Sequence, residues 1–216
     1  MATKKNQSTS TPIIIDSLIQ QYGLVSDQIE VPELRVILRE LFGVLAKNIA
    51  GDVVELGCYE GTSALFIQRM LNLQHSTKAF HVYDSFEGLP EKSSADISPI
   101  GTQFTAGVLR ASKKTLVSNF TKAQLKLPHI HAGWFDALRP DDMPEKIAFA
   151  FLDGDYYSSI TESFLAIQHA LQPGAVILID DYANGQLPGA KKATDDWARS
   201  HSLAVRAEAS LGIIRI

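Results

Sequence analysis

The chain has 216 residues, of which 45% are hydrophobic, and this is enough for a single domain with a sizeable core. The net charge of −4 gives no electrostatic reason to expect nucleic acid as a partner, and no apolar run approaches the roughly 20 residues that span a membrane. Cys58 is the single cysteine, which excludes a disulfide framework within the chain and fits a cytoplasmic protein.

The N-terminal part of the chain predicts a tail followed by helices. Residues 1–12 are small, polar and rich in Ser and Thr, so we expect a disordered tail there. A short helix is predicted after this tail, and a longer one over residues 32–48, where apolar residues repeat at helical spacing. We expect one domain over residues 13–216, in which the helices of residues 13–50 cover one edge of a core formed by residues 51–216.

Residues 53–71 predict a buried strand, a glycine turn and a helix. Gly57 and Gly61 lie in the turn, where they allow a ligand to approach the backbone, and the helix start offers unpaired N–H groups. Tyr59 stands where the dinucleotide fingerprint has its middle glycine, which argues against a pyrophosphate ligand. Glu55, just before the turn, favours a cationic ligand such as the amino group of S-adenosylmethionine. The alternative is an ordinary strand-turn-helix unit without a ligand.

Asp84 ends a second predicted strand, at residues 80–83. An acid at the carboxyl end of this strand can accept hydrogen bonds from both hydroxyls of an adenosine ribose. The alternative is that Asp84 caps the next turn. The polar connection over residues 85–107 is too long for a plain loop, and we expect a lid there.

Trp134 and Phe135 follow a third predicted strand and its turn. Their rings could flank an adenine ring, although core packing explains them equally well. His131, at the end of the same strand, is a weak candidate for a proton acceptor, and a structural role is the stronger interpretation.

Carboxylates follow the next two predicted strands, over residues 147–152 and 175–179. These carboxylates are Asp153, Asp155, Asp180 and Asp181. Ligands bind at the carboxyl ends of strands in open α/β sheets, and neighbouring carboxylates repel one another without a cation, so the pattern predicts a metal site. Oxygen ligands favour Mg²⁺, Ca²⁺ or Mn²⁺ over softer metals. The alternative is that these residues only cap turns.

The end of the chain predicts a helix over residues 188–201 and a hairpin of strands 203–207 and 211–216. Together with the preceding strand–helix units, this order predicts an α/β fold. We expect a doubly wound, Rossmann-like, mostly parallel seven-stranded sheet with a C-terminal antiparallel hairpin and helices on both faces.

Five motifs occur in one order within residues 51–201. They are Val-Glu-Leu-Gly-Cys-Tyr-Glu-Gly-Thr-Ser at 54–63, Tyr-Asp-Ser-Phe-Glu-Gly-Leu-Pro at 83–90, Gly-Trp-Phe at 133–135, Leu-Asp-Gly-Asp-Tyr-Tyr-Ser-Ser at 152–159, and Pro-Gly-Ala…Ile-Asp-Asp-Tyr at 173–182. In this order they resemble the class I S-adenosylmethionine-dependent methyltransferases and, within them, the macrocin O-methyltransferase family, which methylates sugar hydroxyls of macrolides and related products.

The resemblance implies roles for the matching residues. The residues that it assigns to the methionine end of the cofactor are Glu55, Gly57, Tyr59 and Ser63. The residues that it assigns to Mg²⁺ are Asp153, Asp180 and Asp181. Asp84 would bind the ribose. In the more distant catechol O-methyltransferases a lysine shortly after the first metal aspartate serves as base; here Tyr156 holds that place, so the lysine's role does not carry over.

The resemblance therefore implies a Mg²⁺-dependent O-methyltransferase that uses S-adenosylmethionine and acts on a hydroxyl of a small molecule, foremost a sugar of a glycosylated natural product. A bound divalent ion lowers the pKa of a coordinated oxygen, and Asp153 and Asp155 are the candidates to receive the acceptor's proton. The sequence names neither the acceptor nor the oligomeric state, and a homo-oligomer is left open.

Three other functions remain open on the sequence. One is a catechol-like phenolic O-methyltransferase. Another is a nucleotide-binding oxidoreductase, which the missing middle glycine disfavours. The last is a non-catalytic module that binds Ca²⁺ or Mg²⁺, for which the glycine turn would have no use.

Overall fold

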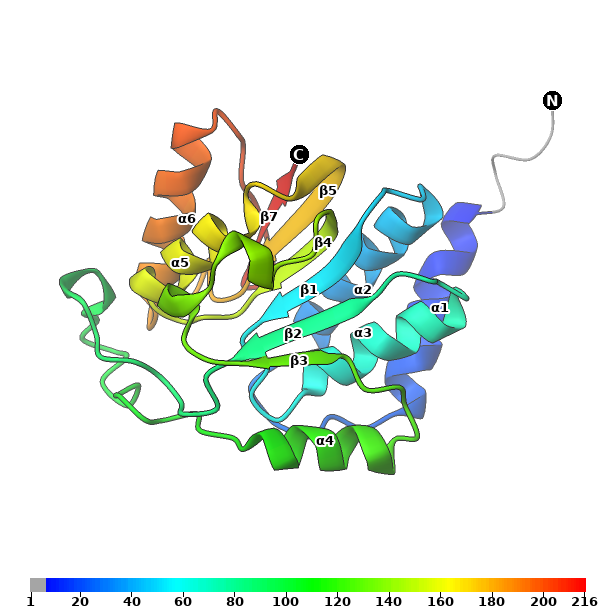
Figure 1. Ribbon diagram of the computed structural model, residues 1–216, viewed down its shortest axis with the longest axis horizontal. Coiled ribbons are helices and arrows are strands. Elements are labelled where there is room, and N and C mark those ends of the chain that lie inside the picture. The colour runs from blue at the N-terminus through cyan, green and yellow to red at the C-terminus, as the bar shows by residue number, and fades with distance from the viewer. Residues whose placement is uncertain (1–6) are drawn as a thin grey trace.

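A seven-stranded sheet forms the centre of the computed structural model, which describes residues 7–216 (Figure 1). Its strands are β1 Asp52–Leu56, β2 Phe80–Asp84, β3 His129–Ala132, β4 Ile147–Leu152, β5 Leu171–Ile179, β6 Arg206–Glu208 and β7 Leu211–Arg215. Their order across the sheet is β3-β2-β1-β4-β5-β7-β6. Strands β1 to β5 are parallel, and β7 runs antiparallel to both of its neighbours. The predicted fold class is confirmed.

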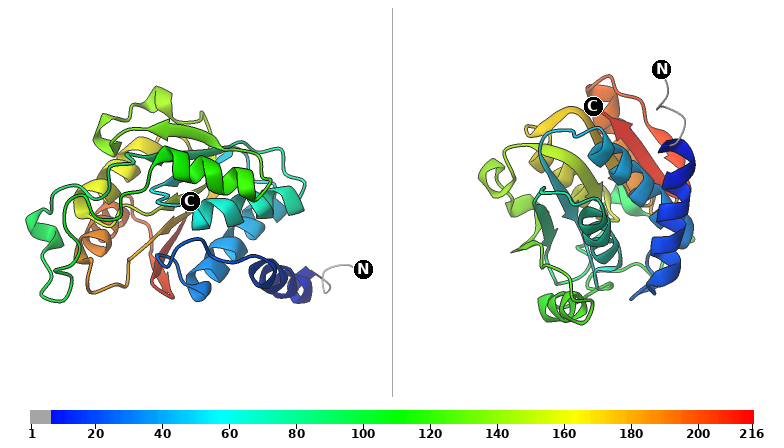
Figure 2. Two further views of the ribbon diagram at one scale, coloured as in Figure 1. Left: turned by 90° about the horizontal axis from the view of Figure 1, so that it is seen from below. Right: turned by 90° about the vertical axis from the view of Figure 1, so that its right-hand side faces the viewer.

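Helices cover both faces of this sheet (Figure 2). The α-helices are α1 Gln7–Gln21, α2 Val31–Ala46, α3 Thr62–Leu73, α4 Lys113–Lys122, α5 Tyr157–Ile167 and α6 Pro188–Ser200. Short 3-10 helices are η1 Ser94–Asp96, η2 Phe135–Ala137 and η3 Pro140–Asp142. Successive side chains of a strand point to opposite faces, so Val53 packs with α1 to α4, whereas Val54 and Leu56 pack with α5 and α6. Within residues 7–216, no helix has both the length and the apolar character needed to cross a membrane.

The N-terminal boundary differs from the prediction. Helix α1 begins at Gln7, so residues 7–12, which we expected to be disordered, are helical; residues 1–6 lie outside the described part of the chain. A polar composition does not distinguish a disordered tail from the exposed part of a surface helix, because both are solvated. The apolar residues Ile15 and Leu18, which are buried against α2, anchor the helix.

Backbone hydrogen bonds align the carboxyl ends of four neighbouring strands. Gly57 N–H donates to the Tyr83 carbonyl, Asp153 N–H to the Leu56 carbonyl, and Asp180 N–H to the Leu152 carbonyl, each at 2.8 Å. The strand order reverses between β1 and β4, and ligands bind at such a reversal in open α/β sheets. The residues just after β1, β4 and β5 therefore meet at one edge, at the left of Figure 1.

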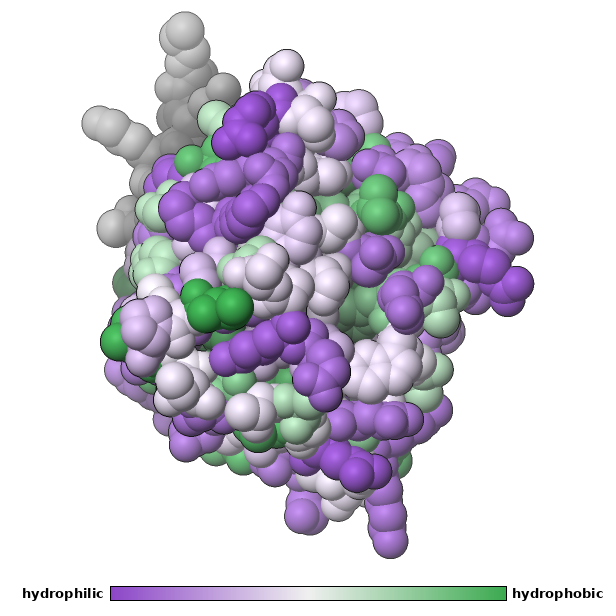
Figure 3. All heavy atoms as spheres, turned by 90° about the vertical axis from the view of Figure 1, so that its left-hand side faces the viewer, coloured by the Kyte–Doolittle hydropathy of each residue, from purple (hydrophilic) through white to green (hydrophobic). Residues whose placement is uncertain are grey.

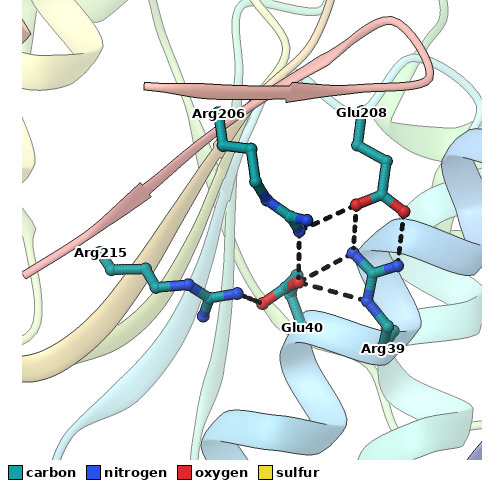
Figure 4. A network of polar contacts seen from close by, with 5 residues as sticks. All are labelled: Arg39, Glu40, Arg206, Glu208 and Arg215. Atoms are coloured by element: carbon teal, nitrogen blue, oxygen red, sulfur yellow. Dashed lines mark hydrogen bonds and ion pairs between the residues drawn. The ribbon is translucent and has the colours of Figure 1, made fainter. Parts of the chain in front are cut away.

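An ion-pair network ties α2 to the C-terminal hairpin (Figure 4). Glu40 is only 6% exposed and accepts from Arg39 Nη2 at 2.9 Å and from Arg215 Nη2 at 2.6 Å. Arg206 lies 3.5 Å from the same carboxylate and 2.8 Å from Glu208, which also pairs with Arg39. A buried carboxylate needs such partners to offset its lost hydration. The network fixes α2, and with it the chain segment at its N-terminal end, against the sheet.

Candidate active site

A cavity of about 730 Å³ lies at the carboxyl edge of the sheet. Figure 3 shows this side of the molecule, with green apolar side chains recessed between purple hydrophilic ones. The predicted site residues that line the cavity are Gly57, Tyr59, Asp84, Trp134, Phe135, Asp153, Asp155, Asp180 and Asp181. Glu55, Gly61 and Ser63 do not line it; they lie behind the glycine turn.

Gly57 lets the turn after β1 pack against the end of β4. Its φ is +91°, and a Cβ atom at this position would lie 1.8 Å from the Asp153 carbonyl oxygen. Gly61 caps α3 with φ +93°, and there a Cβ atom would lie 2.4 Å from a side-chain carbon of Leu116. Both positive φ values favour glycine. At Gly61 the near atom is the end of the Leu116 side chain of α4, whereas at Gly57 it is backbone, so Gly57 brings the turn and the end of β4 together.

Glu55 and Ser63 form a buried pair beneath the turn. The Ser63 hydroxyl donates a hydrogen bond to Glu55 Oε1, and Glu55 Oε2 has no partner among the described residues. Burial raises the pKa of the Glu55 carboxyl to about 8, the Ser63 hydrogen bond opposes this rise, and the Asp84 charge adds to it. An unpartnered buried carboxylate oxygen on β1, beside Ser63 in the first turn of α3, is a fitting partner for an ammonium group.

Asp84 closes the turn with three hydrogen bonds. Its Oδ2 accepts from the N–H groups of Cys58 at 2.8 Å and Tyr59 at 3.2 Å, and its Oδ1 accepts from Phe86 N–H at 2.7 Å. A carboxylate offers about four acceptor positions. Asp84 therefore caps the turn, and it retains capacity for about one ribose hydroxyl rather than two.

Trp134 and Phe135 both border the cavity but differ in how far they are buried. Trp134 is 37% exposed and precedes η2 as its N-cap, so its ring borders the cavity as free surface. Phe135 also borders the cavity but is half-buried against the α5–α6 core. Of the two predicted adenine-flanking rings, Trp134 is the one without a packing role in the core.

Three carboxylates after β4 and β5 meet closely enough to share a cation. One oxygen from each of Asp153, Asp155 and Asp181 lies within 4.8 Å of the other two. Asp155 and Asp181 have φ values of +60° and +56°, which are uncommon for residues with a side chain. Strained backbone of this kind is concentrated at functional sites, where the surroundings impose it.

Asp180 is not a member of this close group, although we predicted it as a ligand. Its Oδ1 accepts from Asp181 N–H at 3.0 Å and lies 3.5 Å from the Ser210 hydroxyl, in the turn of the hairpin. Asp155, which we predicted as a proton acceptor, takes the third position. Asp180 still lines the cavity and adds its charge to that of Asp153.

Burial and mutual repulsion raise the pKa values of these four carboxyls. Burial is the largest cause that raises the pKa of Asp153, Asp155, Asp180 and Asp181, and neighbouring carboxylates are the next cause for the first three. The pKa of Asp155 rises to about 8, with Asp181 as its strongest charged neighbour. Asn184 steadies the group, since its Nδ2 donates to Asp181 Oδ1 at 2.7 Å. An oxygen-only set of this kind fits Mg²⁺, Ca²⁺ or Mn²⁺.

His131 and Tyr156 are not suited to accept the acceptor's proton. His131 stacks on Tyr83 at 4.3 Å between ring centroids and lies 3.3 Å from the His81 ring nitrogen, away from the residues that line the cavity. The structural interpretation of His131 fits this position. Tyr156 is fully buried, its hydroxyl has no partner among the described residues, and its pKa is raised to about 12, first by burial.

The connection after β2 supplies an apolar wall. Four apolar residues line the cavity and pack together with the Tyr156 ring behind them: Leu89, Phe104, Leu109 and Leu187. The connection is fastened at η1, where Asp96 accepts from Tyr157 N–H at 2.7 Å, and at Ser98, which donates to the Gly185 carbonyl at 2.8 Å. It lines the cavity, and its role as a lid stays a prediction.

The sequence did not predict several of the residues that line the cavity. Asp27, Gln28, Glu30 and Glu33 reach the cavity from the segment between α1 and α2 and from the first turn of α2. The spacing of Glu30 and Glu33 is typical of helix-capping residues, and in the structure they form a capping box at the start of α2. Only the packing of α2 against the sheet brings them to the site.

Comparisons with known proteins agree with this architecture. A 4'-O-methyltransferase of 8-demethyl-8-(2,3-dimethoxy-alpha-L-rhamnosyl)-tetracenomycin C from Streptomyces olivaceus is 33% identical over 65% of this chain and 56% of its own length. The chain matches between 56% and 65% of the length of three curated relatives. The O-methyltransferase NovP superposes with a TM-score of 0.75 at 22% identity, over 87% of this chain and 80% of its own. CalS11, described as a TDP-rhamnose 3'-O-methyltransferase, has a TM-score of 0.60 at 15% identity, over 99% and 96%.

The family-level match covers most of the chain. The family model described as macrocin-O-methyltransferase (TylF) matches residues 22–208, which include the glycine turn, the lid, the carboxylate group and the hairpin strand β6. The chain therefore belongs to the macrocin-O-methyltransferase (TylF) family.

Proposed function

We propose that this protein is an S-adenosylmethionine-dependent and Mg²⁺-dependent O-methyltransferase that acts on a sugar hydroxyl of a glycosylated natural product. The observation that carries the proposal is the backbone contact between Gly57 and Asp153. Through this contact the cofactor turn and the carboxylate group border the same cavity, so a methyl donor and an activated hydroxyl can meet there. Family membership supports the reaction type, and the curated relative's rhamnosyl substrate supports the sugar.

The chain's own residues account for cofactor binding. The Glu55 carboxylate, held by the Ser63 hydroxyl, would accept the ammonium group of the methionine end through Oε2. The backbone of Gly57 and Tyr59 would border the same end, and Asp84 would hold one ribose hydroxyl. Trp134 would lie against the adenine. S-adenosylmethionine, when bound, supplies an electrophilic methyl group on a sulfonium.

The carboxylate group accounts for activation of the acceptor. Asp153, Asp155 and Asp181 would hold the divalent cation, and Asp180 would hold the Asp181 backbone. A divalent cation, when bound, lowers the pKa of a hydroxyl by several units. In the transfer, the acceptor oxygen forms a bond to the methyl carbon, and the electron pair of the breaking C–S bond stays on sulfur. The hydroxyl proton would pass to a carboxylate, for which Asp153 and Asp155 are our candidates, each through the oxygen that does not hold the cation.

Two measurements test the proposal. Calorimetry should detect S-adenosylhomocysteine binding in the presence of Mg²⁺, and Glu55→Gln should weaken it about 10-fold or more, because the variant lacks the charge that receives the ammonium group. Transfer of a labelled methyl group from S-adenosylmethionine to a rhamnoside should require Mg²⁺. A protein that does not bind S-adenosylhomocysteine would overturn the methyltransferase proposal.

A further inference from the structure

A cluster of three histidines lies on the first two strands at one edge of the sheet. It consists of His81 on β2 and of His129 and His131 on β3, the edge strand (Figure 1), and these are three of the six histidines of the chain. In the parallel pairing of the two strands, His81 lies opposite His129 and Tyr83 opposite His131. Alternate residues of a strand point to the same face, so all four rings share one face of the sheet. The three histidines are not among the residues that line the cavity of the candidate active site.

The rings of this histidine cluster stack on one another. The ring centroids of His81 lie 4.7 Å from those of His129 and 5.5 Å from those of His131, with interplanar angles of 23° and 15°. Stacking alone would be served by any aromatic ring, whereas histidine also brings nitrogen atoms. Nδ1 of His81 and Nε2 of His131 share a hydrogen bond at 3.3 Å. Two nitrogen ligands of one tetrahedral Zn²⁺ are also about 3.3 Å apart, since each bond is about 2.0–2.1 Å long.

The second nitrogen of His81 faces a carboxylate. Asp52 Oδ2 lies 4.0 Å from His81 Nε2, and Asp52 is fixed because its Oδ1 accepts from Ala79 N–H at 2.9 Å. A carboxylate on this side favours the tautomer that carries its proton on Nε2 and leaves the lone pair of Nδ1 available. Metal-binding histidines commonly have such a partner on their other nitrogen.

The protonation state of the pair suits a metal ligand. Burial, followed by the charges of His129 and His131, lowers the pKa of His81 to about 4, against the opposing effect of Asp52. The pKa of His131 is also lowered, first by burial and then by His129. Both imidazoles are therefore neutral near pH 7, and the neutral form is the one that binds a metal.

We propose that His81 and His131 together bind a late first-row transition-metal ion such as Zn²⁺ or Cu²⁺, with Asp52 orienting His81. Imidazole nitrogen suits these ions, whereas the oxygen-only carboxylate group suits Mg²⁺, so the two sites differ in the metal that they take. On binding, the proton of His131 Nε2 moves to its Nδ1, so that both rings stay neutral and each donates one lone pair. Water would complete the coordination. The inference does not depend on the proposed function.

The ion would join the edge strand to the rest of the sheet. His81 and His131 lie on different strands, so a shared ion adds a link between β2 and β3 that only the folded chain can form. An ion that binds only the folded state stabilises it. We therefore expect Zn²⁺ to raise the melting temperature of the protein even when the carboxylate group is saturated with Mg²⁺.

Electron paramagnetic resonance tests the ligand type directly. The untagged full chain, in excess Mg²⁺, receives equimolar Cu²⁺, and the nitrogen hyperfine splitting of the spectrum distinguishes imidazole from carboxylate ligands. We expect the splitting of two imidazole nitrogens. The spectrum should persist in Asp155→Asn, because this change weakens the carboxylate group and leaves the histidines intact.

Zn²⁺ titration calorimetry in excess Mg²⁺ identifies the residues. His81→Gln and His131→Gln should each lower the affinity about 10-fold or more, and so should Asp52→Asn, as is usual when the partner of a ligating histidine is lost. His169→Gln is the matched control, because it removes an exposed histidine on another element and should leave the affinity unchanged. Melting of each metal-free variant checks its folding.

Two results would overturn the inference. One is a Cu²⁺ spectrum without nitrogen splitting in the wild type. The other is a Zn²⁺ affinity that folded His81→Gln and His131→Gln leave unchanged. If either histidine variant fails to fold, the Asp52→Asn titration and the disappearance of the nitrogen splitting in the remaining variant decide the matter.

Discussion

Gly57 and Asp153 touch through their backbones: a single added carbon at Gly57 would lie 1.8 Å from the Asp153 carbonyl oxygen. This contact joins the two halves of the candidate site, since Gly57 follows β1 in the glycine turn and Asp153 follows β4 in the carboxylate group. In the proposed reaction, it would bring the methyl donor close to the activated hydroxyl.

Gly57→Ala should therefore destabilise the fold and abolish cofactor binding. The new methyl group would overlap the Asp153 carbonyl, and alanine disfavours a φ of +91°. Thermal unfolding and calorimetry with S-adenosylhomocysteine measure both effects. Gly23→Ala is the control, because nothing lies within 4 Å of its added carbon, and its stability should stay within about 0.5 kcal/mol of the wild type. A stable Gly57→Ala protein that binds the cofactor would refute the role of this contact.

Asp84→Ala should weaken S-adenosylhomocysteine binding about 10- to 150-fold, because a charged hydrogen-bond partner is lost. Asp84 also holds the N–H groups of Cys58 and Tyr59, so the variant alone does not separate ribose binding from support of the turn. A cofactor analogue without the ribose hydroxyls separates them. If Asp84 holds a hydroxyl, removing that hydroxyl should cost affinity in the wild type and nothing in Asp84→Ala. An equal loss of affinity in both proteins would mean that Asp84 only supports the turn and does not bind the ribose.

Metal removal should abolish methyl transfer. We expect EDTA to stop the reaction and Mg²⁺ to restore it, since the site otherwise holds mutually repelling carboxylates. Asp155→Asn should weaken Mg²⁺ binding more than Asp180→Asn, because Asp155 belongs to the close group and Asp180 does not. Both variants should still bind S-adenosylhomocysteine, which controls for folding. Full activity of the EDTA-treated enzyme would exclude the metal mechanism.

The metal-free and cofactor-free protein should lose stability as the pH rises. Burial raises the pKa of Glu55 from 4.5 and that of Asp155 from 3.8, in each case to about 8. Between the unfolded and folded pKa values, the folded state binds more protons than the unfolded state. The contribution of these two carboxyls to the free energy of unfolding is therefore fully present below about pH 4 and is lost as the pH rises through about 8. Melting temperatures across this range measure the decline. Glu55→Gln and Asp155→Asn should each make it shallower, and a profile that they leave unchanged would contradict the assignment.

Tyr156→Phe should leave turnover within about threefold and leave stability unchanged or raised, because it removes a buried hydroxyl that has no partner among the described residues. The ring would continue to support Leu89 and Leu187. Kinetics and thermal unfolding of the variant check this, with Tyr156→Ala as the contrast that removes the ring. A loss of turnover above about tenfold in Tyr156→Phe would instead give the hydroxyl a role in catalysis.

The sequence by itself determined the sheet and indicated the edge at which the candidate site lies. Strand-ending residues such as Asp84 and Asp153 identify the carboxyl edge, because hydrophobic periodicity marks each strand and parallel strands end together. It also placed Gly57 in a turn between a strand and a helix start, where we expected a ligand to approach the backbone; the close neighbour in the structure is the Asp153 carbonyl. These inferences need only neighbours along the chain.

Only the tertiary structure decided which carboxylates lie together in the cavity, because they come from separate segments of the chain. Asp155, rather than Asp180, lies within 4.8 Å of Asp153 and Asp181, and Asp155 and Asp181 both have positive φ. The carboxylates of Glu30 and Glu33 reach the cavity only because α2 packs on the sheet and is held there by Glu40 and its arginines. The carboxylates of the cavity thus come from segments far apart in sequence, and folding alone brings them within the range at which charges act on one another.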